Sequence, residues 1–276
     1  MRKLLAVVGI IALAVPLLAR PVAAAQAQEP GGNPTGVLGP VNALGQEVQR
    51  PPAPTGPPPR LPDGTIDLGD GIWVGSPFGA DIGIGLKRGE VLPLLPSAQA
   101  LMASRKGVDD PVNWCLPLGV LRSSPYPFRF IQNYTHKKPT HMYILSEWMR
   151  MYRQVFMDGR RHPSELDPTW FGHSTGWYEG DTLVIDTVGL NDKFWFDRRG
   201  TPHTERLHTI ERWTRVDAGH LVQEVTIDDP GAYSRPFTVT FQATLSQPGD
   251  ELMEYVCQEN NQYGVASGSA NPFAGP

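Results

Sequence analysis

From about residue 125 onward the chain alternates apolar and polar residues, which is the pattern of β-strands with one buried face. The segment 237–245 (FTVTFQATL) is the clearest example, because Phe, Val, Phe, Ala and Leu occupy every second position. Threonines and a glutamine fill the positions between them. Segments of this kind predict nine strands, at residues 127–132, 141–147, 149–156, 174–178, 182–187, 205–216, 220–228, 237–245 and 252–258.

Turns and loops separate these segments, and no helical pattern lies between them. Neighbouring strands joined in this way run antiparallel, and closing so many of them into a ring removes exposed edges. We therefore expect a mainly β fold, an antiparallel up-and-down meander that forms a lipocalin-like barrel or half-barrel. A two-sheet sandwich is the alternative. One short helix is expected at 97–106 (SAQALMASRK), where Ala, Leu, Met and Lys favour helix.

The segment 205–216 departs from clean alternation. Leu207 and Trp213 share one face with Glu211, whereas Ile210 shares the other face with His208. At least one ionisable side chain must therefore point inward, whichever face of this strand is buried.

Changes in composition divide the chain into four parts. Residues 1–27 combine a basic start, an uncharged apolar run and small residues, as a signal peptide does. A membrane anchor is the alternative, but the run is shorter than the roughly 20 apolar residues that span a bilayer. Residues 28–66 are rich in proline and glycine, which predicts a disordered tether. A single β-rich domain is expected at 67–262, followed by a flexible tail at 263–276.

This organisation predicts an exported protein, periplasmic or extracellular, with no membrane span after the leader is cleaved. The net charge is −4, and loss of the basic residues of the leader makes it more negative. Nucleic acid is not expected as a partner, because no basic stripe offsets the repulsion. The sequence sets no oligomeric state.

Cys115 and Cys257 are the two cysteines of the chain. In an oxidising compartment they predict one disulfide, worth on the order of 4 kcal/mol because it closes a long loop. Two free thiols or a two-cysteine metal site are the alternatives, although neither cysteine lies in a metal-ligand spacing.

The chain carries several distinctive phrases, in the order PDGTIDLGDGIW, WCLPLG, DGRRHPSELDPTW, GHSTGWYEGDTLVIDTVGLND, HTERLHTIER, VTIDDPGAY and YVCQENNQ. Together they resemble a large family of exported proteins from environmental bacteria, over roughly residues 63–262. The resemblance implies a single domain with those limits. It implies no activity and no catalytic residue.

Ionisable residues concentrate between residues 157 and 229, where the connection 188–204 is long for a compact domain. A histidine oriented by a carboxylate would act as general acid or base there, and an arginine would polarise a substrate oxygen. Each of these residues also has a structural alternative, as a turn residue, a cross-strand partner or a core aromatic. The candidates for catalysis are His162, His173, Asp186, His203, His208 and Glu211, and those for substrate binding are Arg160, Trp177, Trp195 and Arg212.

Cofactors are not expected, since the chain has no phosphate-binding loop, nucleophile elbow or Cys/His nucleophile pair. A metal ion is not expected either. His203 and His208 lie five residues apart, and residues with that spacing on a strand point to opposite faces.

The leading hypothesis is a cofactor-independent acid/base enzyme, a hydrolase, lyase or isomerase, acting on a small organic molecule in a pocket at the end of the barrel. It requires a histidine and a carboxylate within hydrogen-bond reach of each other on the wall of a single cavity, and it fails if these side chains are scattered over the barrel exterior. The alternatives are a non-catalytic, lipocalin-like carrier for an apolar ligand and a structural protein of the cell envelope.

Overall fold

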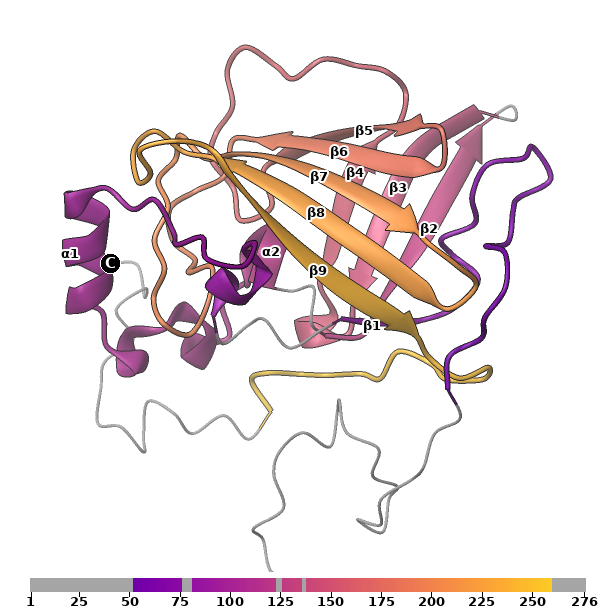
Figure 1. Ribbon diagram of the computed structural model, residues 1–276, viewed down its shortest axis with the longest axis horizontal. Helices are drawn as coiled ribbons and strands as arrows, with labels where there is room; N and C mark the ends of the chain where they lie inside the picture. Colours follow the sequence, from indigo (N-terminus) through magenta and orange to yellow (C-terminus); the bar gives the residue numbers. More distant parts are fainter. Residues whose placement is uncertain (1–51, 76–80, 123–125, 136–137, 260–276) are drawn as a thin grey trace, which may run out of the picture.

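The computed structural model describes residues 52–75, 81–122, 126–135 and 138–259. Nine strands follow one another around a closed barrel, in which β9 pairs with β1 to complete the ring (Figure 1). The expected mainly β barrel is confirmed, and the two-sheet alternative is wrong. The strands are β1 (Trp73–Gly75), β2 (Phe128–Thr135), β3 (Lys138–Ser146), β4 (Tyr152–Phe156), β5 (His173–Glu179), β6 (Thr182–Val188), β7 (His208–Arg215), β8 (His220–Asp228) and β9 (Phe237–Leu245).

The last predicted strand is wrong, because residues 252–258 form no strand. Its place in the ring is taken by the three-residue strand β1. All of β1 pairs with β9, between Ala243 and Leu245, and Trp73 also pairs with Phe128 of β2. The edge of β9 is therefore already occupied, and the alternating segment that follows it finds no partner there.

The meander is antiparallel except at one pair. Strands β4 and β5 run parallel, with Val155 opposite Ser174 and Phe156 opposite Thr175. The connection 157–172 must therefore return along the barrel before β5 begins, and it arches over the β5 side of the barrel in Figure 1. The expectation of a purely up-and-down meander is wrong at this point.

The strand predicted from residue 149 begins later. Met149 and Arg150 have a left-handed φ of 53° and lie in the 3₁₀ turn η6 (Trp148–Arg150), so that β4 starts only at Tyr152.

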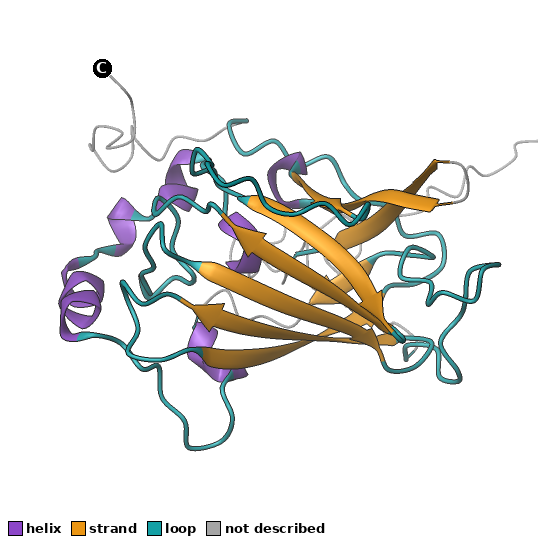
Figure 2. Ribbon diagram, turned by 90° about the horizontal axis from the view of Figure 1, so that it is seen from above, coloured by secondary structure: helices purple, strands orange, loops and turns teal. Residues whose placement is uncertain are grey.

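Helical segments gather at one end of the barrel (Figures 1 and 2). The expected helix is confirmed as α1 (Pro96–Ser104), which has proline at its first position, where an N–H would lack a partner in any case. The others are α2 (Gly119–Arg122) and the 3₁₀ turns η3 (Ile82–Gly85), η4 (Gly107–Asp109) and η5 (Pro111–Trp114).

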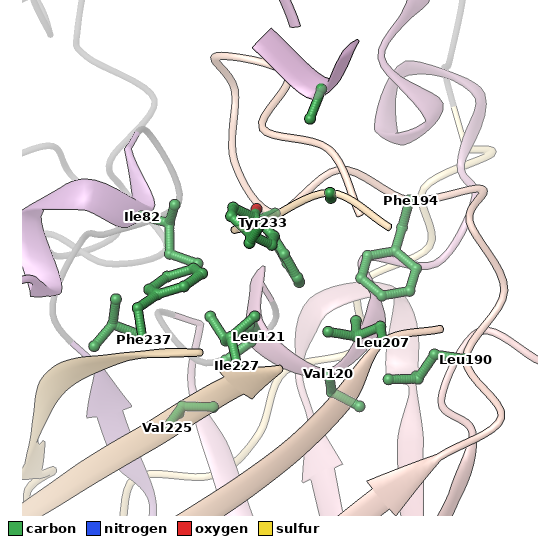
Figure 3. Close-up of a cluster of buried hydrophobic side chains, with 14 of the residues drawn as sticks. Ile82, Val120, Leu121, Leu190, Phe194, Leu207, Val225, Ile227, Tyr233 and Phe237 are labelled. Atoms are coloured by element: carbon green, nitrogen blue, oxygen red, sulfur yellow. The ribbon is translucent and has the colours of Figure 1, made fainter. Parts of the chain in front are cut away.

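A hydrophobic cluster joins these segments to the barrel (Figure 3). Val225 and Ile227 of β8 contribute to it, together with Leu121 of α2 and Phe194 of the connection 189–207. Apolar burial at this end therefore fixes the helices and the long connection against the strand ends.

A second cluster fills the interior of the barrel with side chains that include Trp73, Phe130, Met142 and Trp213. The alternation of 237–245 places Phe237, Val239, Phe241 and Ala243 inward, as expected. A cavity lined by Ser146, Arg153 and Trp213, among others, has a volume of about 20 Å³, enough for about one water molecule.

Cys115 and Cys257 form the expected disulfide, across 142 positions of the chain. The predicted leader and tail lie outside the described residues. The described end of the predicted tether, residues 52–66, contacts the barrel: Ile66 is fully buried, and Arg60 forms an ion pair with Asp181 at 2.6 Å. No helix in the described part of the chain is long and apolar enough to cross a membrane.

Candidate functional site

Three of the candidate residues lie on the outer face of adjacent strands. His173, Asp186 and His208 belong to β5, β6 and β7, respectively. Their neighbours Ser174 and Thr187 are fully buried inside the barrel, so the alternation of a strand directs the three side chains outward. We expected a pocket at the barrel end, and the structure places these residues on the outer wall instead.

The fourth member, His162, comes from the connection 157–172. Its Nδ1 lies 2.8 Å from Nδ1 of His173, and its Nε2 lies 3.3 Å from Oδ1 of Asp186. The same oxygen of Asp186 lies 2.8 Å from Nε2 of His208. The four side chains form one hydrogen-bonded row, His173–His162–Asp186–His208, which we call the histidine chain.

The carboxylate determines where the protons of the neutral histidine chain lie. An ionised carboxylate only accepts hydrogen bonds, so Nε2 of His162 and Nε2 of His208 both donate to Asp186. A neutral His162 then has a lone pair on Nδ1, which accepts the N–H of His173 Nδ1. In this arrangement Nε2 of His173 carries no proton and has no hydrogen-bond partner among the described residues.

The surroundings of His173 favour its neutral form. Burial lowers the pKa of His173, and the positive charge that His162 carries when it is protonated and the charge of Arg160 lower it further. The His173 ring stacks on Phe156 with the centroids 5.0 Å apart, and the guanidinium of Arg160 also lies over the Phe156 ring, 3.9 Å from its centroid. Hydrogen bonds from Arg160 hold the pKa of Asp158 at about 2, so this carboxylate stays ionised.

The histidine chain remains within reach of solvent. The side chains of His162, Asp186 and His208 are 22%, 25% and 37% exposed, respectively. A molecule in solution can therefore contact the group without any opening of the barrel.

Backbone contacts hold the connection 157–172 over the strands. Thr169 N donates to Gly189 O at 3.0 Å, and Asn191 N donates to Thr169 O at 2.8 Å. Gly172, the residue before β5, has a φ of +62° and lies so close to Val188 that a Cβ atom there would be 2.5 Å from its carbonyl oxygen. Glycine is thus required where the connection enters β5 and His173 is set in place.

Glu211 lies on the opposite side of the wall, in the barrel interior. Its side chain is fully buried, and Oε1 is 2.6 Å from Nη1 of Arg153 in β4. Oε2 accepts from Trp213 Nε1 at 3.2 Å and from Gln223 Nε2 at 3.0 Å. This confirms that an ionisable group of β7 points inward, and it separates Glu211 from the histidine chain.

Arg153 is the interior residue that sequence reasoning missed. Its guanidinium donates to Ser174 Oγ at 3.0 Å and to Thr187 Oγ1 at 2.6 Å. With Glu211 and Gln223 these residues form a polar layer between the two hydrophobic clusters. The parity of β4 would have revealed it, since Arg153 alternates with the fully buried Val155.

His203 lies in the hydrophobic cluster at the helical end. Nε2 donates to Phe194 O at 2.9 Å, and the ring packs on Phe194 and Phe196 at 4.0 and 4.8 Å between centroids. Burial lowers the pKa of His203 to about 4, so the imidazole is neutral at pH 7. This arrangement is that of a core residue.

The remaining binding candidates are also apart from the histidine chain. Trp177 Nε1 and Arg212 Nη2 both donate to Glu179, at 2.9 and 2.8 Å, on the exposed surface of the β5–β6 hairpin. Trp195 is buried beneath the guanidinium of Arg105, which lies 5.0 Å from the ring centroid. Only Arg160 of the four lies beside the histidine chain.

Among the described residues, no group of three or more His, Cys, Asp or Glu side chains is arranged to hold a metal ion. Comparison of the chain with family models, with curated proteins and with solved structures finds no match. The function is therefore inferred from the geometry alone.

Proposed function

We propose that the protein is a cofactor-independent acid/base enzyme whose catalytic group is the histidine chain on the outer wall. One observation supports this most: a single carboxylate, Asp186, orients two imidazoles and, through His162, a third. Orientation of a histidine by a carboxylate is the arrangement on which general acid/base catalysis depends.

The assigned roles follow from the proton positions. The bare Nε2 of His173 acts as general base, and its lowered pKa keeps it unprotonated at neutral pH. His162 and Asp186 are positioning residues that fix the tautomer of His173. His208, at the other end of the chain, holds a proton on Nε2 through Asp186, and its side chain is 37% exposed.

Hydrolysis of a small ester suits this arrangement. His173 removes a proton from water as the oxygen attacks the carbonyl carbon, and the guanidinium of Arg160 stabilises the negative charge that develops on the carbonyl oxygen. The C–O bond to the alcohol then breaks, and the proton returns to the departing alkoxide. No cofactor enters this sequence.

The carrier alternative has less support in the barrel interior. The cavity lined by Arg153 and Trp213 has a volume of about 20 Å³, whereas pockets for small molecules measure roughly 300–1,000 Å³. The two hydrophobic clusters and the polar layer occupy the space that a lipocalin-like carrier would leave for its ligand.

We also propose that the protein is exported to the periplasm or the extracellular space. The signal-peptide pattern of residues 1–27 motivates this, and the disulfide between Cys115 and Cys257 is compatible with an oxidising compartment.

The test is an assay of the purified protein with 4-nitrophenyl acetate, butyrate and phosphate, in the presence of EDTA. We expect turnover of at least one ester, and a loss of kcat/KM of roughly hundredfold or more in both His173→Gln and Asp186→Asn. His220→Gln is the matched control, because His220 also pairs with an aspartate, Asp217 at 2.9 Å, but lies away from the histidine chain.

Equal losses in His220→Gln, or full activity in His173→Gln, would show that the histidine chain is not the catalytic group. Absence of turnover in the wild-type protein with every ester would reject ester hydrolysis. Loss of activity in EDTA that zinc or another divalent ion restores would reject cofactor independence.

A further inference from the structure

The barrel closes through a weak seam between β1 and β2. Three residues of β1 pair with β9, but only Trp73 pairs with β2, opposite Phe128. On the N-terminal side of Trp73 the described chain makes no strand pairing with β2. Gly69 lies against the backbone there, since a Cβ atom at this position would be 2.8 Å from the carbonyl oxygen of Phe130.

A pocket of about 380 Å³ lies at this seam, within the size range of sites for small organic molecules. Because the wall is interrupted here, the pocket is lined by inward-facing and by outward-facing side chains of β2. Its apolar lining comes from Leu61, Leu68, Phe130, Ile131 and Met142. Its polar lining comes from Asp67, Arg129 and Gln132.

Arg129 supplies an unpaired positive charge at the pocket. Its Nε donates weakly to the carbonyl of Gly69, at 3.4 Å. In the described part of the chain no carboxylate lies within 4.0 Å of the guanidinium, and its terminal nitrogens have no protein partner. Arg153 and Arg215, by contrast, have carboxylates at 2.6 and 2.8 Å.

The other polar side chains of the pocket each have one oxygen engaged. Asp67 Oδ1 accepts from Gly69 N at 2.8 Å, and Gln132 Oε1 accepts from the hydroxyl of Tyr178 at 3.2 Å. A free guanidinium beside apolar walls fits a carboxylate, which it can bind with two parallel N–H bonds, on a molecule with an apolar body.

We propose that this seam pocket binds an amphipathic organic carboxylate, with its carboxylate on Arg129 and its apolar body against Leu68, Phe130 and Met142. The site is independent of the histidine chain. His173 lies at the first residue of β5, whereas Tyr178, which reaches the pocket through Gln132, lies near the opposite end of the same strand.

The probes are decanoate, decanol and decylamine, titrated calorimetrically into the protein below their aggregation concentrations. We expect decanoate to bind more tightly than decanol, and decylamine to bind most weakly. Arg129→Gln should weaken the affinity for decanoate roughly tenfold to hundredfold, which is the effect of losing a charge-assisted hydrogen bond. The affinity for decanol should stay the same within about twofold. Arg150→Gln is the matched control, since Arg150 is an exposed arginine paired with Glu254.

A second pair of variants tests the location without touching the charge. Leu61→Trp fills the pocket and should weaken the binding of decanoate and of decanol alike. Leu101→Trp, on the exposed face of α1, should weaken the binding of neither. Thermal unfolding of each variant checks the fold. Should Arg129→Gln fail to fold, Arg129→Lys keeps the charge and loses the two-bond geometry, and should weaken decanoate by a smaller factor.

Equal affinity of decanoate for the wild type and for the folded Arg129 variant would overturn the proposal. So would equal affinity of decanoate and decanol, an unaltered affinity in Leu61→Trp, or no binding of decanoate to the wild type. None of these outcomes bears on ester hydrolysis by His173.

Discussion

The carboxylate of Glu211 and the guanidinium of Arg153 lie 2.6 Å apart inside the barrel, at 0% and 6% side-chain exposure. They connect β7 to β4, two strands that are not neighbours in the ring. The contact is ionic and not a well-aligned hydrogen bond, because no N–H is directed at Oε1 of Glu211. Each partner is otherwise satisfied by neutral groups of the polar layer.

Removal of one charge from this pair should be strongly destabilising. Glu211→Gln leaves the guanidinium of Arg153 buried without a counter-charge, and we expect a loss of about 3–5 kcal/mol in the free energy of unfolding, measured by chemical denaturation. The double variant Arg153→Met/Glu211→Leu should lose clearly less free energy of unfolding than the two single variants lose together, because no unpaired charge remains.

Arg212→Met is the control for this prediction, since its pair with Glu179 is exposed and should contribute little. Additive losses in the double variant would mean that Arg153 and Glu211 act independently, contrary to the geometry.

The strands of the barrel were predictable where the residues of the strand itself carry the pattern. Alternation in 237–245 and in 220–228 depends on each strand having one buried face, so those strands appear within a residue of their expected ends. The three residues of β1 are too few to show alternation, and the parallel pairing of β4 with β5 is decided by tertiary packing. The segment 252–258 alternates and still forms no strand, because pairing also needs a free edge.

The sequence predicted which residue types could form the candidate site, but not which of those residues lie together in space. His173, Asp186 and His208 share the outer face because their strands are adjacent, which strand parity and order would give. His162 joins them only through the path of the connection 157–172, which no periodicity describes. Glu211 and His203 had the right chemistry, but the first lies inside the barrel and the second in the hydrophobic cluster.

Buried His203 should make stability depend on pH. Its pKa in the folded protein is about 4, below the ordinary value of about 6.5 that it regains on unfolding. Between these values the unfolded chain binds a proton that the folded protein does not, so stability falls as the pH falls from about 6.5 to 4. The contribution is on the order of 3 kcal/mol in total, since each pKa unit corresponds to about 1.4 kcal/mol.

Denaturation at a series of pH values checks this prediction. The slope of unfolding free energy against pH between 4 and 6.5 should be smaller in His203→Gln than in the wild type, whatever the stability of the variant at pH 7. Parallel slopes would show that other groups cause the pH dependence.

Gly172 should tolerate no side chain. Gly172→Ala places a Cβ atom 2.5 Å from the carbonyl oxygen of Val188 in a residue with φ of +62°. We expect the free energy of unfolding to fall by at least about 2 kcal/mol, because the left-handed conformation is unfavourable for alanine and because the contacted backbone cannot move aside. Gly180→Ala separates the two causes, because Gly180 has a φ of +60° and nothing within 4 Å of the added atom.

Gly180→Ala should therefore lower the free energy of unfolding by about 1 kcal/mol, the cost of the left-handed conformation alone. Equal losses in the two variants, measured by thermal or chemical unfolding, would mean that Val188 gives way and that the entry to β5 is not constrained by this contact.

The histidine chain makes a prediction that needs no substrate. Burial, and next the charges of His162 and Arg160, lower the pKa of His173 below its ordinary value, so an NMR titration should find it deprotonating below pH 6.5. Arg160→Gln removes a permanent positive charge, and His162→Gln removes the positive charge that His162 carries when it is protonated. Both should raise the pKa of His173, while His220→Gln should leave it unchanged. A rate that depends on unprotonated His173 falls as the pH is lowered through that pKa, and the fall should move to higher pH in the same two variants. A His173 pKa at or above 6.5 in the wild type, or one that neither variant shifts, would mean that the row of hydrogen bonds does not persist in solution.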